Sequence, residues 1–388
     1  MQQTHRTYSK KFPIKVAVVI PSYGFVGGAE LFAFELAERI AVQDKFDIHV
    51  FAMKFEKSTA PITFHKASNI YLPRFLKPIA FAWHVDRQIK SGCFDVVHSH
   101  ERIFSADIFS VHGIPHEVWI RDVRKKNRSL FDKATSCVER KGYKSNEAIL
   151  LPVSSMVSER LIEHYNICDK KLKIMHPGID LKRFTSMDAR TVRDSIRSGY
   201  GLTDEDTVAL FVGMNFEIKQ LELIVRAVAE ANKKWPGYGR IMLLVIGKGN
   251  QRRYHDMAME LGIDKHIIFT GVRKDVENFY AASDFFVMPS LTDTFGMVVL
   301  EAMASNLPVI VSDKVGAKDI ITDGKTGFIV PADSSPSSLA DVFLKLSSAE
   351  KRKLMGEAAF LTALSHDWDK KAGELAEIYE NIAAIKQN

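Results

Sequence analysis

Cysteine is scarce in this sequence. Three cysteines, Cys93, Cys137 and Cys168, occur among 388 residues, and their spacing fits neither a zinc site nor a disulfide framework. Long apolar runs are also missing, since none reaches the roughly 18–20 residues that cross a bilayer. The apolar run at residues 16–20 is short and strand-like, and it does not resemble a secretory signal. We therefore expect a cytoplasmic protein from a reducing compartment, without a transmembrane span.

Repeats and low-complexity tracts are absent too, and the composition is that of a globular protein, with 46% hydrophobic and 26% charged residues. A chain of this length exceeds one ordinary core, so two domains are expected. The net charge of +6 is concentrated in a basic run from Arg121 to Lys144. This run is typical of a solvated helix face, or of a surface for anionic lipid or a phosphorylated acceptor. Nucleic acid is disfavoured, because no aromatic-studded or helix-turn-helix pattern accompanies the charge.

Short apolar runs alternate with helical patterns along the chain, which predicts βαβ units around parallel sheets. The helix predicted at residues 29–42 has an apolar face that includes Leu31 and Leu36. In contrast, residues 185–206 are charged and lack apolar periodicity, as expected of a domain boundary. In a parallel sheet, ligands bind at the carboxyl ends of the strands. The predicted strands are residues 15–20, 47–52, 94–99, 107–111, 148–153, 208–212, 241–246, 267–270, 284–288 and 308–311.

The most informative stretch is residues 289–303, where a predicted strand, a tight loop and a helix follow one another. Backbone amides at Phe295 and Gly296 would lie at the helix N-terminus, which favours binding of a phosphate. Asp293 either caps this helix or contacts a ligand. Glu301 is a carboxylate on an apolar helix face, so it needs a partner: an Arg or Lys, or the hydroxyls of a ribose.

Two further groups of residues follow predicted strands in the first half. Gly27 and Gly28 precede a helix, although a glycine pair alone is weak evidence of a ligand. His98, His100 and His112 occur at strand ends, where a histidine is often structural, and His-x-His without a further ligand gives little support for a metal. We predict no metal site and no cofactor.

Taken together, these motifs resemble family 4 retaining GT-B glycosyltransferases. Asp293 and Glu301 stand at the ends of the family's Glu-x7-Glu signature, with Asp in place of the first Glu. Residues 27–30 resemble its Gly-Gly-x-Glu loop. Residues 173–184 resemble its Pro-x-Gly-x-Asp-x-x-x-Phe segment, with His176 in place of the more usual Pro or Asn. Residues 100–121 are most similar to the lipopolysaccharide-core glucosyltransferase branch.

The resemblance implies an α/β GT-B fold: two Rossmann-like domains with an inter-domain cleft and a C-terminal helix that crosses back to the first domain. We predict an acceptor-side domain at 1–184, a nucleotide-sugar domain at 185–366 and the terminal helix at 367–388. The loop after the strand at 208–212 departs from the family pattern, because Met214 replaces an Arg and Gln220 a Gly.

The resemblance also assigns roles to individual residues. His112 and Asp293 would orient the donor sugar, and Lys219 would stabilise the charge of the diphosphate leaving group. Glu301 would bind ribose, while Arg183 is either a phosphate contact or an exposed structural arginine. The implied donor-binding residues are Gly27, Gly28, Arg183, Gly213, Lys219, Gly247, Arg273, Thr294, Phe295, Gly296 and Glu301.

The implied reaction is metal-independent transfer of a hexose, with retention, from a nucleotide diphosphate sugar such as UDP-glucose. The acceptor would be a lipopolysaccharide-core or other cell-surface glycan, met at the cytoplasmic face of the inner membrane through the basic run. Two alternatives share the fold: a nucleotide-sugar epimerase or phosphorylase, and a non-catalytic nucleotide-sugar-binding protein.

Overall fold

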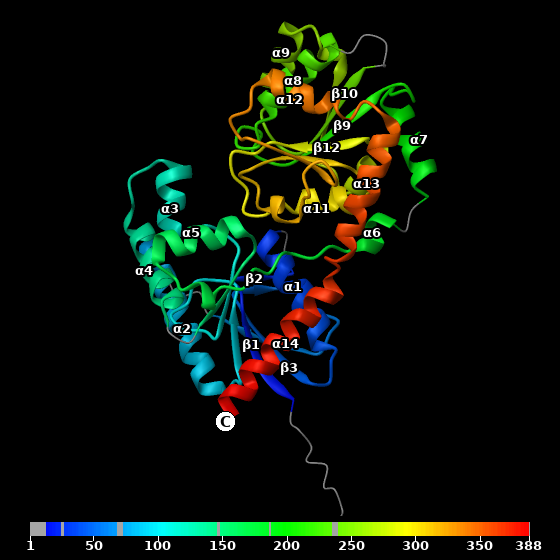
Figure 1. The fold of residues 1–388 in the computed structure, drawn as a ribbon. Helices are drawn as coiled ribbons and strands as arrows, with labels where there is room; N and C mark the ends of the chain where they lie inside the picture. The colour runs from blue at the N-terminus through cyan, green and yellow to red at the C-terminus, as the bar shows by residue number, and fades with distance from the viewer. Residues whose placement is uncertain are drawn as a thin grey trace, which may run out of the picture. The chain divides into compact units, whose positions relative to one another are not determined.

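The structure is a computed structural model, and it describes residues 13–24, 27–67, 73–145, 148–185, 188–234 and 240–387. The chain forms two α/β units (Figure 1). The first contains the described residues up to Pro152, Ser158–Met175 and the residues from Asp369 onward. The second contains Val153–Val157 and His176–Trp368.

The first unit is built on a six-stranded parallel sheet in the order β5-β3-β1-β6-β7-β8. Its central strands are runs of buried apolar residues, as expected when helices cover both faces of a parallel sheet. A separate two-stranded sheet pairs β2 (Ser22–Tyr23) with β4 (Lys54–Phe55). The strands of the main sheet are β1 (Ile14–Val19), β3 (Phe46–Ala52), β5 (Ile62–Lys66), β6 (Val96–Ser99), β7 (Ile108–Val111) and β8 (Ile149–Pro152).

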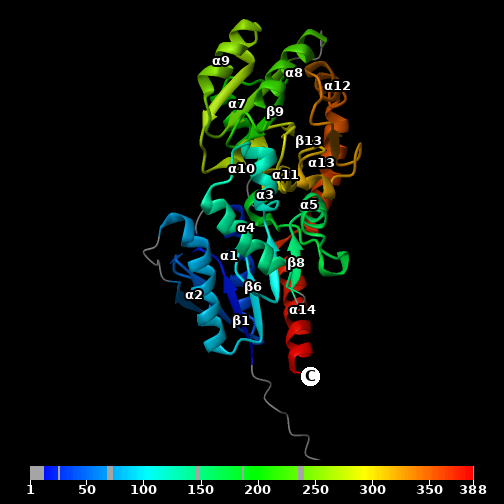
Figure 2. The same ribbon diagram turned by 90° about the vertical axis from the view of Figure 1, so that its left-hand side faces the viewer.

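Helices cover both faces of this sheet, with α2 on one side and α14 on the other (Figure 2). The C-terminal helix α14 packs beside α1, where Asp369 accepts a hydrogen bond from Arg39 at 2.8 Å and Glu380 accepts one from Lys45 at 3.0 Å. The predicted return of a terminal helix to the first domain is therefore confirmed. The helices are α1 (Gly28–Ala41), α2 (Lys77–Gly92), α3 (His116–Val118), a π-helix (Trp119–Arg124), α4 (Leu130–Tyr143), α5 (Ser155–Tyr165) and α14 (Trp368–Gln387), with 3-10 turns at Arg74–Leu76 and Asp169–Lys171.

The second unit repeats this architecture with the strand order β11-β10-β9-β12-β13-β14, again all parallel. One face carries α8, α9 and α12, and its core includes Phe285 against Phe343 with ring centroids 5.2 Å apart (Figure 1). The strands are β9 (Thr207–Val212), β10 (Ile241–Ile246), β11 (Ile267–Gly271), β12 (Phe285–Met288), β13 (Val309–Ser312) and β14 (Gly327–Val330).

The opposite face of the second sheet carries α7, α10, α11 and α13. The helices of this unit are α6 (Leu181–Thr185), α7 (Ala189–Gly199), α8 (Leu221–Lys234), α9 (Gln251–Glu260), α10 (Val276–Ala282), α11 (Met297–Ala304), α12 (Pro336–Leu344) and α13 (Ala349–Leu364), with 3-10 turns at Asp264–His266 and Gly316–Ile320.

Within residues 185–206, where we expect a domain boundary, Ala189–Gly199 form the helix α7, which belongs to the second unit. An arginine holds the buried position that an apolar residue usually takes in such a helix. Arg197 is only 3% exposed, and its guanidinium donates to the carbonyls of Ala282, Thr203 and Asp206 at 3.1, 2.7 and 2.6 Å. Both terminal nitrogens of the guanidinium have acceptors, while Nε has none among the described residues. A buried arginine with most of its donors paired is tolerated, but a search for apolar periodicity does not find it.

Among the described residues, no helix combines the length and the apolar character that crossing a bilayer requires.

Candidate functional site

The loop between β12 and α11 places backbone amides at the start of a helix. Gly296 is the cap residue of α11 and has a left-handed backbone with φ of 89°. A Cβ added there would lie 2.9 Å from Met288 Cε and 3.3 Å from Val315 Cγ1, so glycine suits both the conformation and the space. Phe295 anchors the loop, since its side chain is buried and its carbonyl accepts a hydrogen bond from Ala317 N at 2.7 Å.

Asp293 and Lys219 form an ion pair in the same unit. The backbone of Asp293 is fixed from both sides, because its N–H donates to Lys314 O at 3.0 Å and its carbonyl accepts from Gly316 N at 2.9 Å. One carboxylate oxygen accepts a long hydrogen bond of 3.3 Å from Phe295 N, and the other contacts the Lys219 ammonium. Asp293 is therefore not the cap of α11, and its charge is directed at the lysine.

Lys219 lies in the loop that follows β9, next to the glycines at two strand ends. Gly213 donates to Ile246 O at 3.0 Å, and a Cβ on Gly247 would lie 1.8 Å from Gly213 O. Gly247 also has φ of 137°, so two independent constraints require glycine there. The predicted positions Gly213, Gly247 and Lys219 thus lie together at the carboxyl ends of neighbouring strands.

Gln220 belongs to this site, although the sequence marked it only as a departure from the family pattern. Its backbone is left-handed, with φ of 57°, which explains why a glycine suits this position in the family pattern. Its side-chain amide donates to Pro289 O at 2.5 Å and to Ala332 O at 2.8 Å. Gln220 therefore ties the loop that carries Lys219 to the loop that leads to Asp293. The one signal in the sequence is the family pattern, which has a glycine at this position; neither the positive φ nor the two hydrogen bonds can be read from the glutamine itself.

Glu301 lies on α11 and accepts a hydrogen bond of 2.9 Å from the hydroxyl of Tyr280. Burial raises the pKa of this carboxyl above its ordinary value. The protein partner of Glu301 is thus a tyrosine, while Arg183 pairs with Glu277 at 2.7 Å. Because the Tyr280 hydroxyl occupies one oxygen, the other remains suitable for a hydroxyl of a ligand.

The remaining predicted residues of the second unit have structural contacts. Arg273 pairs with Asp275 at 2.8 Å, and the carbonyl of Thr294 accepts from Ser154 Oγ at 2.6 Å. Arg183 and Arg273 therefore pair with acidic side chains other than Asp293. Lys219 takes part in neither of these two ion pairs.

In the first unit, Gly27 precedes α1 and Gly28 begins it; residues 25 and 26 of the same loop lie outside the described residues. His112 follows β7, and its Nε2 lies 3.1 Å from Nδ1 of His100. The Phe32 ring contacts it edge-on at 5.0 Å between centroids. Burial lowers the pKa of His112 to about 4, so its imidazole is neutral at physiological pH.

His98, which the sequence placed beside His100, has a structural role. Its ring nitrogens contact the Tyr379 hydroxyl at 2.6 Å and the Ser110 hydroxyl at 2.9 Å. Burial lowers the pKa of His98 to about 3. Within the described ranges, no group of three or more His, Cys, Asp and Glu side chains is arranged to hold a metal ion.

Two family models, both of glycosyltransferases, match successive parts of the chain. Residues 26–183 match the family model described as Glycosyltransferase Family 4, and residues 192–361 match Glycosyl transferases group 1. The chain thus consists of a family 4-type domain followed by a group 1 domain, on the predicted GT-B fold.

Curated relatives carry a specific name. The chain is 27% identical over 310 residues to a D-inositol 3-phosphate glycosyltransferase of Corynebacterium aurimucosum, covering 76% of this chain and 73% of the relative. It is 25% identical over 398 residues to the protein of that name from Streptomyces bingchenggensis, covering 92% and 86%. These names differ from the lipopolysaccharide-core branch that the sequence suggested.

Solved structures show the same fold. WaaG, a glycosyltransferase involved in lipopolysaccharide biosynthesis, superposes with a TM-score of 0.74 at 20% identity, covering 94% of this chain and 99% of WaaG. HepE of Anabaena, solved in complex with UDP and glucose, superposes with a TM-score of 0.69 at 16% identity, covering 95% and 100%.

Proposed function

We propose that the protein is a retaining hexosyltransferase that uses a nucleotide diphosphate sugar, with UDP-glucose as the first donor to test. The observation that carries this proposal is the Lys219–Asp293 ion pair at the carboxyl edge of the second sheet, in the loop that leads to α11. HepE of Anabaena has been solved in complex with UDP and glucose and in complex with UDP-glucose.

The chemistry follows from these groups. As the glycosidic bond breaks, the diphosphate gains negative charge, and Lys219 with the amides at the α11 N-terminus would stabilise it. Asp293 and His112 are proposed to orient the donor sugar, and Glu301 to accept a hydrogen bond from a ribose hydroxyl. The acceptor hydroxyl forms the new bond to the anomeric carbon, and its proton passes to the leaving phosphate on the same face, which retains the configuration.

Gly27, Gly28, Gly213, Gly247, Arg183, Arg273 and Thr294 remain proposed donor-binding residues. For Gly213 and Gly247, close backbone approach at two strand ends supports the proposal. Arg183 and Arg273 carry less support, because each already forms an ion pair with an acidic side chain.

Two acceptors deserve separate tests. A lipopolysaccharide-core or other cell-surface glycan follows from the sequence resemblance, while D-inositol 3-phosphate follows from the names of the curated relatives. Peripheral association with the cytoplasmic face of the inner membrane stays a prediction.

The experiment is a donor screen read by mass spectrometry, in which UDP- and other nucleotide-hexoses are offered with each acceptor. A product heavier by one hexose, formed only when acceptor is present, supports the proposal. Conversion of the donor without acceptor would assign the protein to the epimerases instead. If the protein binds the nucleotide sugar but neither transfers the hexose nor converts the donor, it is a non-catalytic binding protein.

A further inference from the structure

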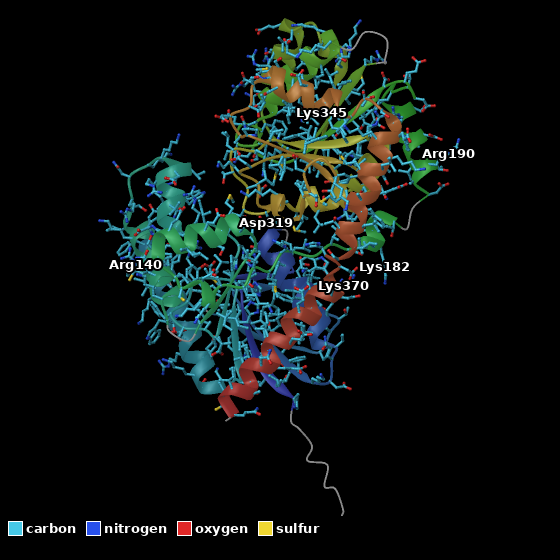
Figure 3. The ribbon with its side chains drawn as sticks, in the orientation of Figure 1. Arg140, Lys182, Arg190, Asp319, Lys345 and Lys370 are labelled. Carbon is cyan, nitrogen blue, oxygen red and sulfur yellow. The ribbon has the colours of Figure 1, made fainter. Side chains whose placement is uncertain are left out.

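The outer side of α4 contains a pocket that the proposed transfer reaction does not use. Its volume is about 620 Å³. In Figure 3, Arg140 of this helix lies at the edge of the first unit. Five of the lining side chains are cations and one is a carboxylate. The lining residues are Glu117, Arg128, Lys133, Ser136, Cys137, Arg140, Lys141, Lys144 and Ser145.

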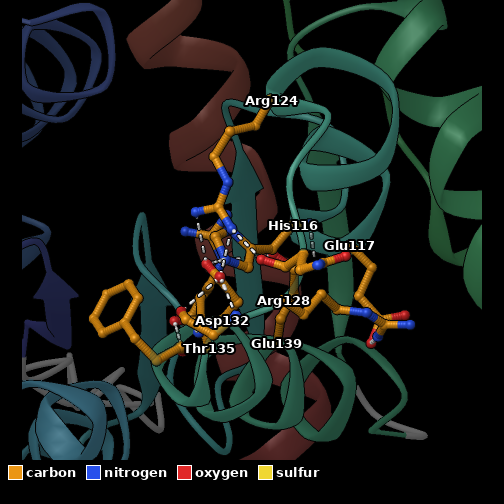
Figure 4. Close-up of polar contacts among 11 residues, drawn as sticks. His116, Glu117, Arg124, Arg128, Asp132, Thr135 and Glu139 are labelled. Carbon is orange, nitrogen blue, oxygen red and sulfur yellow. Dashed lines mark hydrogen bonds and ion pairs between the residues drawn. The ribbon is translucent and has the colours of Figure 1, made fainter.

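The acidic residues of α4 itself do not neutralise this pocket, because they lie on its buried side. The side chains of Asp132 and Glu139 are each only 1% exposed. Asp132 binds the Arg124 guanidinium at 2.5 Å and the His116 ring at 3.1 Å (Figure 4). Glu139 accepts from Arg102 and from the Tyr165 hydroxyl.

This arrangement corrects one reading of the basic run. The interpretation of the basic run as a solvated helix face is wrong for Arg124, because its guanidinium is turned inward and donates to Asp132. This hydrogen bond lowers the pKa of the Asp132 carboxyl. The buried carboxylates fix the segment around His116 against α4, since Glu139 also accepts from His116 N at 2.9 Å. The cations that face the pocket are therefore held on a rigid frame.

Within the pocket, compensation of charge is partial. Glu117 pairs with Arg128 at 2.7 Å and with Arg140 at 3.5 Å. Across the described part of the chain, no ion pair involves Lys133, Lys141 or Lys144. Several like charges on one concave surface repel one another, so an anion that binds among them relieves this repulsion.

A buried hydroxyl supplies a second, independent observation. Ser136 is 3% exposed and lines the pocket, and in the part of the chain that the structure describes its Oγ has no hydrogen-bond partner. The neighbouring Thr135, by contrast, donates to the Phe131 carbonyl at 2.9 Å (Figure 4). Buried hydroxyls are usually paired, so the Ser136 hydroxyl is available to an occupant of the pocket.

We propose that this pocket is a binding site for a phosphate ester or a pyrophosphate. Such a group carries close to two negative charges at neutral pH and offers several acceptor oxygens. Lys133, Lys141 and Lys144 would neutralise it, and Ser136 would donate one hydrogen bond. The site does not depend on the proposed transfer reaction, because it contains none of the donor-binding residues.

Cys137 lies in this pocket and provides a direct readout. Cys93 and Cys168 are also exposed and serve as internal controls in the same molecule. The full-length protein is alkylated with iodoacetamide at constant ionic strength, with increasing pyrophosphate, and each cysteine peptide is quantified by mass spectrometry. We expect the alkylation rate of Cys137 to fall by about fivefold or more, with little change at the two controls.

The double variant Lys133→Gln with Lys144→Gln removes two cations that form no ion pair, so its fold is preserved. It should lose the protection of Cys137. The matched control is Lys54→Gln with Lys57→Gln, two exposed lysines of the same unit, and it should keep the protection. Equal protection in both double variants, or equal slowing at all three cysteines, overturns the proposal.

Two arms distinguish the source of the phosphate. Vesicles of phosphatidylcholine with phosphatidic acid are compared with vesicles of phosphatidylcholine alone. Protection by pyrophosphate but not by phosphatidic acid identifies a soluble phosphate ester, and protection by phosphatidic acid identifies a lipid headgroup. If neither probe protects Cys137, the pocket is only a solvated basic face and the inference fails.

Discussion

Lys219 and Asp293 are 74 residues apart in the chain, and their side chains form an ion pair. The contact exists because β9 and β12 are neighbours in the sheet, so the loops at their carboxyl ends lie side by side. A diphosphate bound at the α11 N-terminus would compete with Asp293 for the lysine ammonium. The pair thus links the proposed leaving-group contact to the proposed sugar contact.

Replacement of Lys219 by alanine tests this link. We expect Lys219→Ala to lower turnover by about 10²–10³-fold, because a charge that stabilises the leaving group is lost. Lys325→Ala, at an exposed position of the same unit, is the control and should retain activity. Steady-state kinetics with the donor, together with thermal unfolding, separates loss of chemistry from loss of fold. Unchanged kcat in Lys219→Ala removes this lysine from the site.

Gln220 should act as a positioning residue. Gln220→Gly relieves a left-handed backbone, which favours folding by about 1 kcal/mol, but it loses two hydrogen bonds of similar value each. We therefore expect a net loss of stability of about 1 kcal/mol and about a tenfold fall in kcat/KM, mainly through a higher KM for the donor.

The matched control for Gln220 is Asn306→Gly, since Asn306 is exposed and also has φ of 57°. It should gain stability and keep its activity. If Gln220→Gly retains the full kcat/KM, the two amide hydrogen bonds do not position Lys219.

His112 should stay neutral across the physiological range. Burial lowers its pKa to about 4 and that of His98 to about 3, whereas an unfolded histidine titrates near 6.5. As the pH falls, these two histidines therefore take up protons in the unfolded chain before they do so in the folded one. The free energy of unfolding is then highest above pH 6.5 and decreases as the pH falls towards 4.

Titration of the imidazole resonances by NMR checks this, with the urea-unfolded protein as the reference. The resonances of His112 should not move between pH 8 and 5.5, and the pH profile of kcat should show no limb from this residue there. A midpoint near 6.5 for His112 would contradict the burial that the fold gives it.

Asp86 on α2 is expected to destabilise the protein at neutral pH. Burial raises its pKa to about 6, and within the described residues its Oδ1 has no hydrogen-bond partner. The pKa of Asp86 is higher in the folded protein than in the unfolded chain. The stabilising contribution of its protonated carboxyl is therefore fully present below pH 4 and is lost as the pH rises through 6.

Asp86→Asn should therefore raise the free energy of unfolding at pH 8 by about 1–3 kcal/mol, and should have no effect near pH 4. Urea unfolding at both pH values measures the difference. An equal effect at the two pH values would show that packing, and not ionisation, distinguishes the two side chains.

The element pattern was predictable because its information is local. Buried strands of a parallel sheet are short apolar runs, and the predicted strands differ from the observed ones by one or two residues at their ends. Helix α1 was also predicted, although Leu31, assigned to its apolar face, is 38% exposed while Phe32 is buried. The strand β5 and the helix α2 were missed, since their mixed polarity resembles that of a loop.

The site was predictable only where a residue type is itself the signal. By itself the sequence determined two Rossmann-like domains, the family resemblance and the positions of Gly296, Asp293, Lys219 and Glu301, because spacing and glycine requirements are properties of the chain. Only the tertiary structure decided which charges meet: Lys219 with Asp293, Arg183 with Glu277, and Arg124 with Asp132 inside the basic run. Such pairings depend on which strands and helices become neighbours, and long-range packing sets that order.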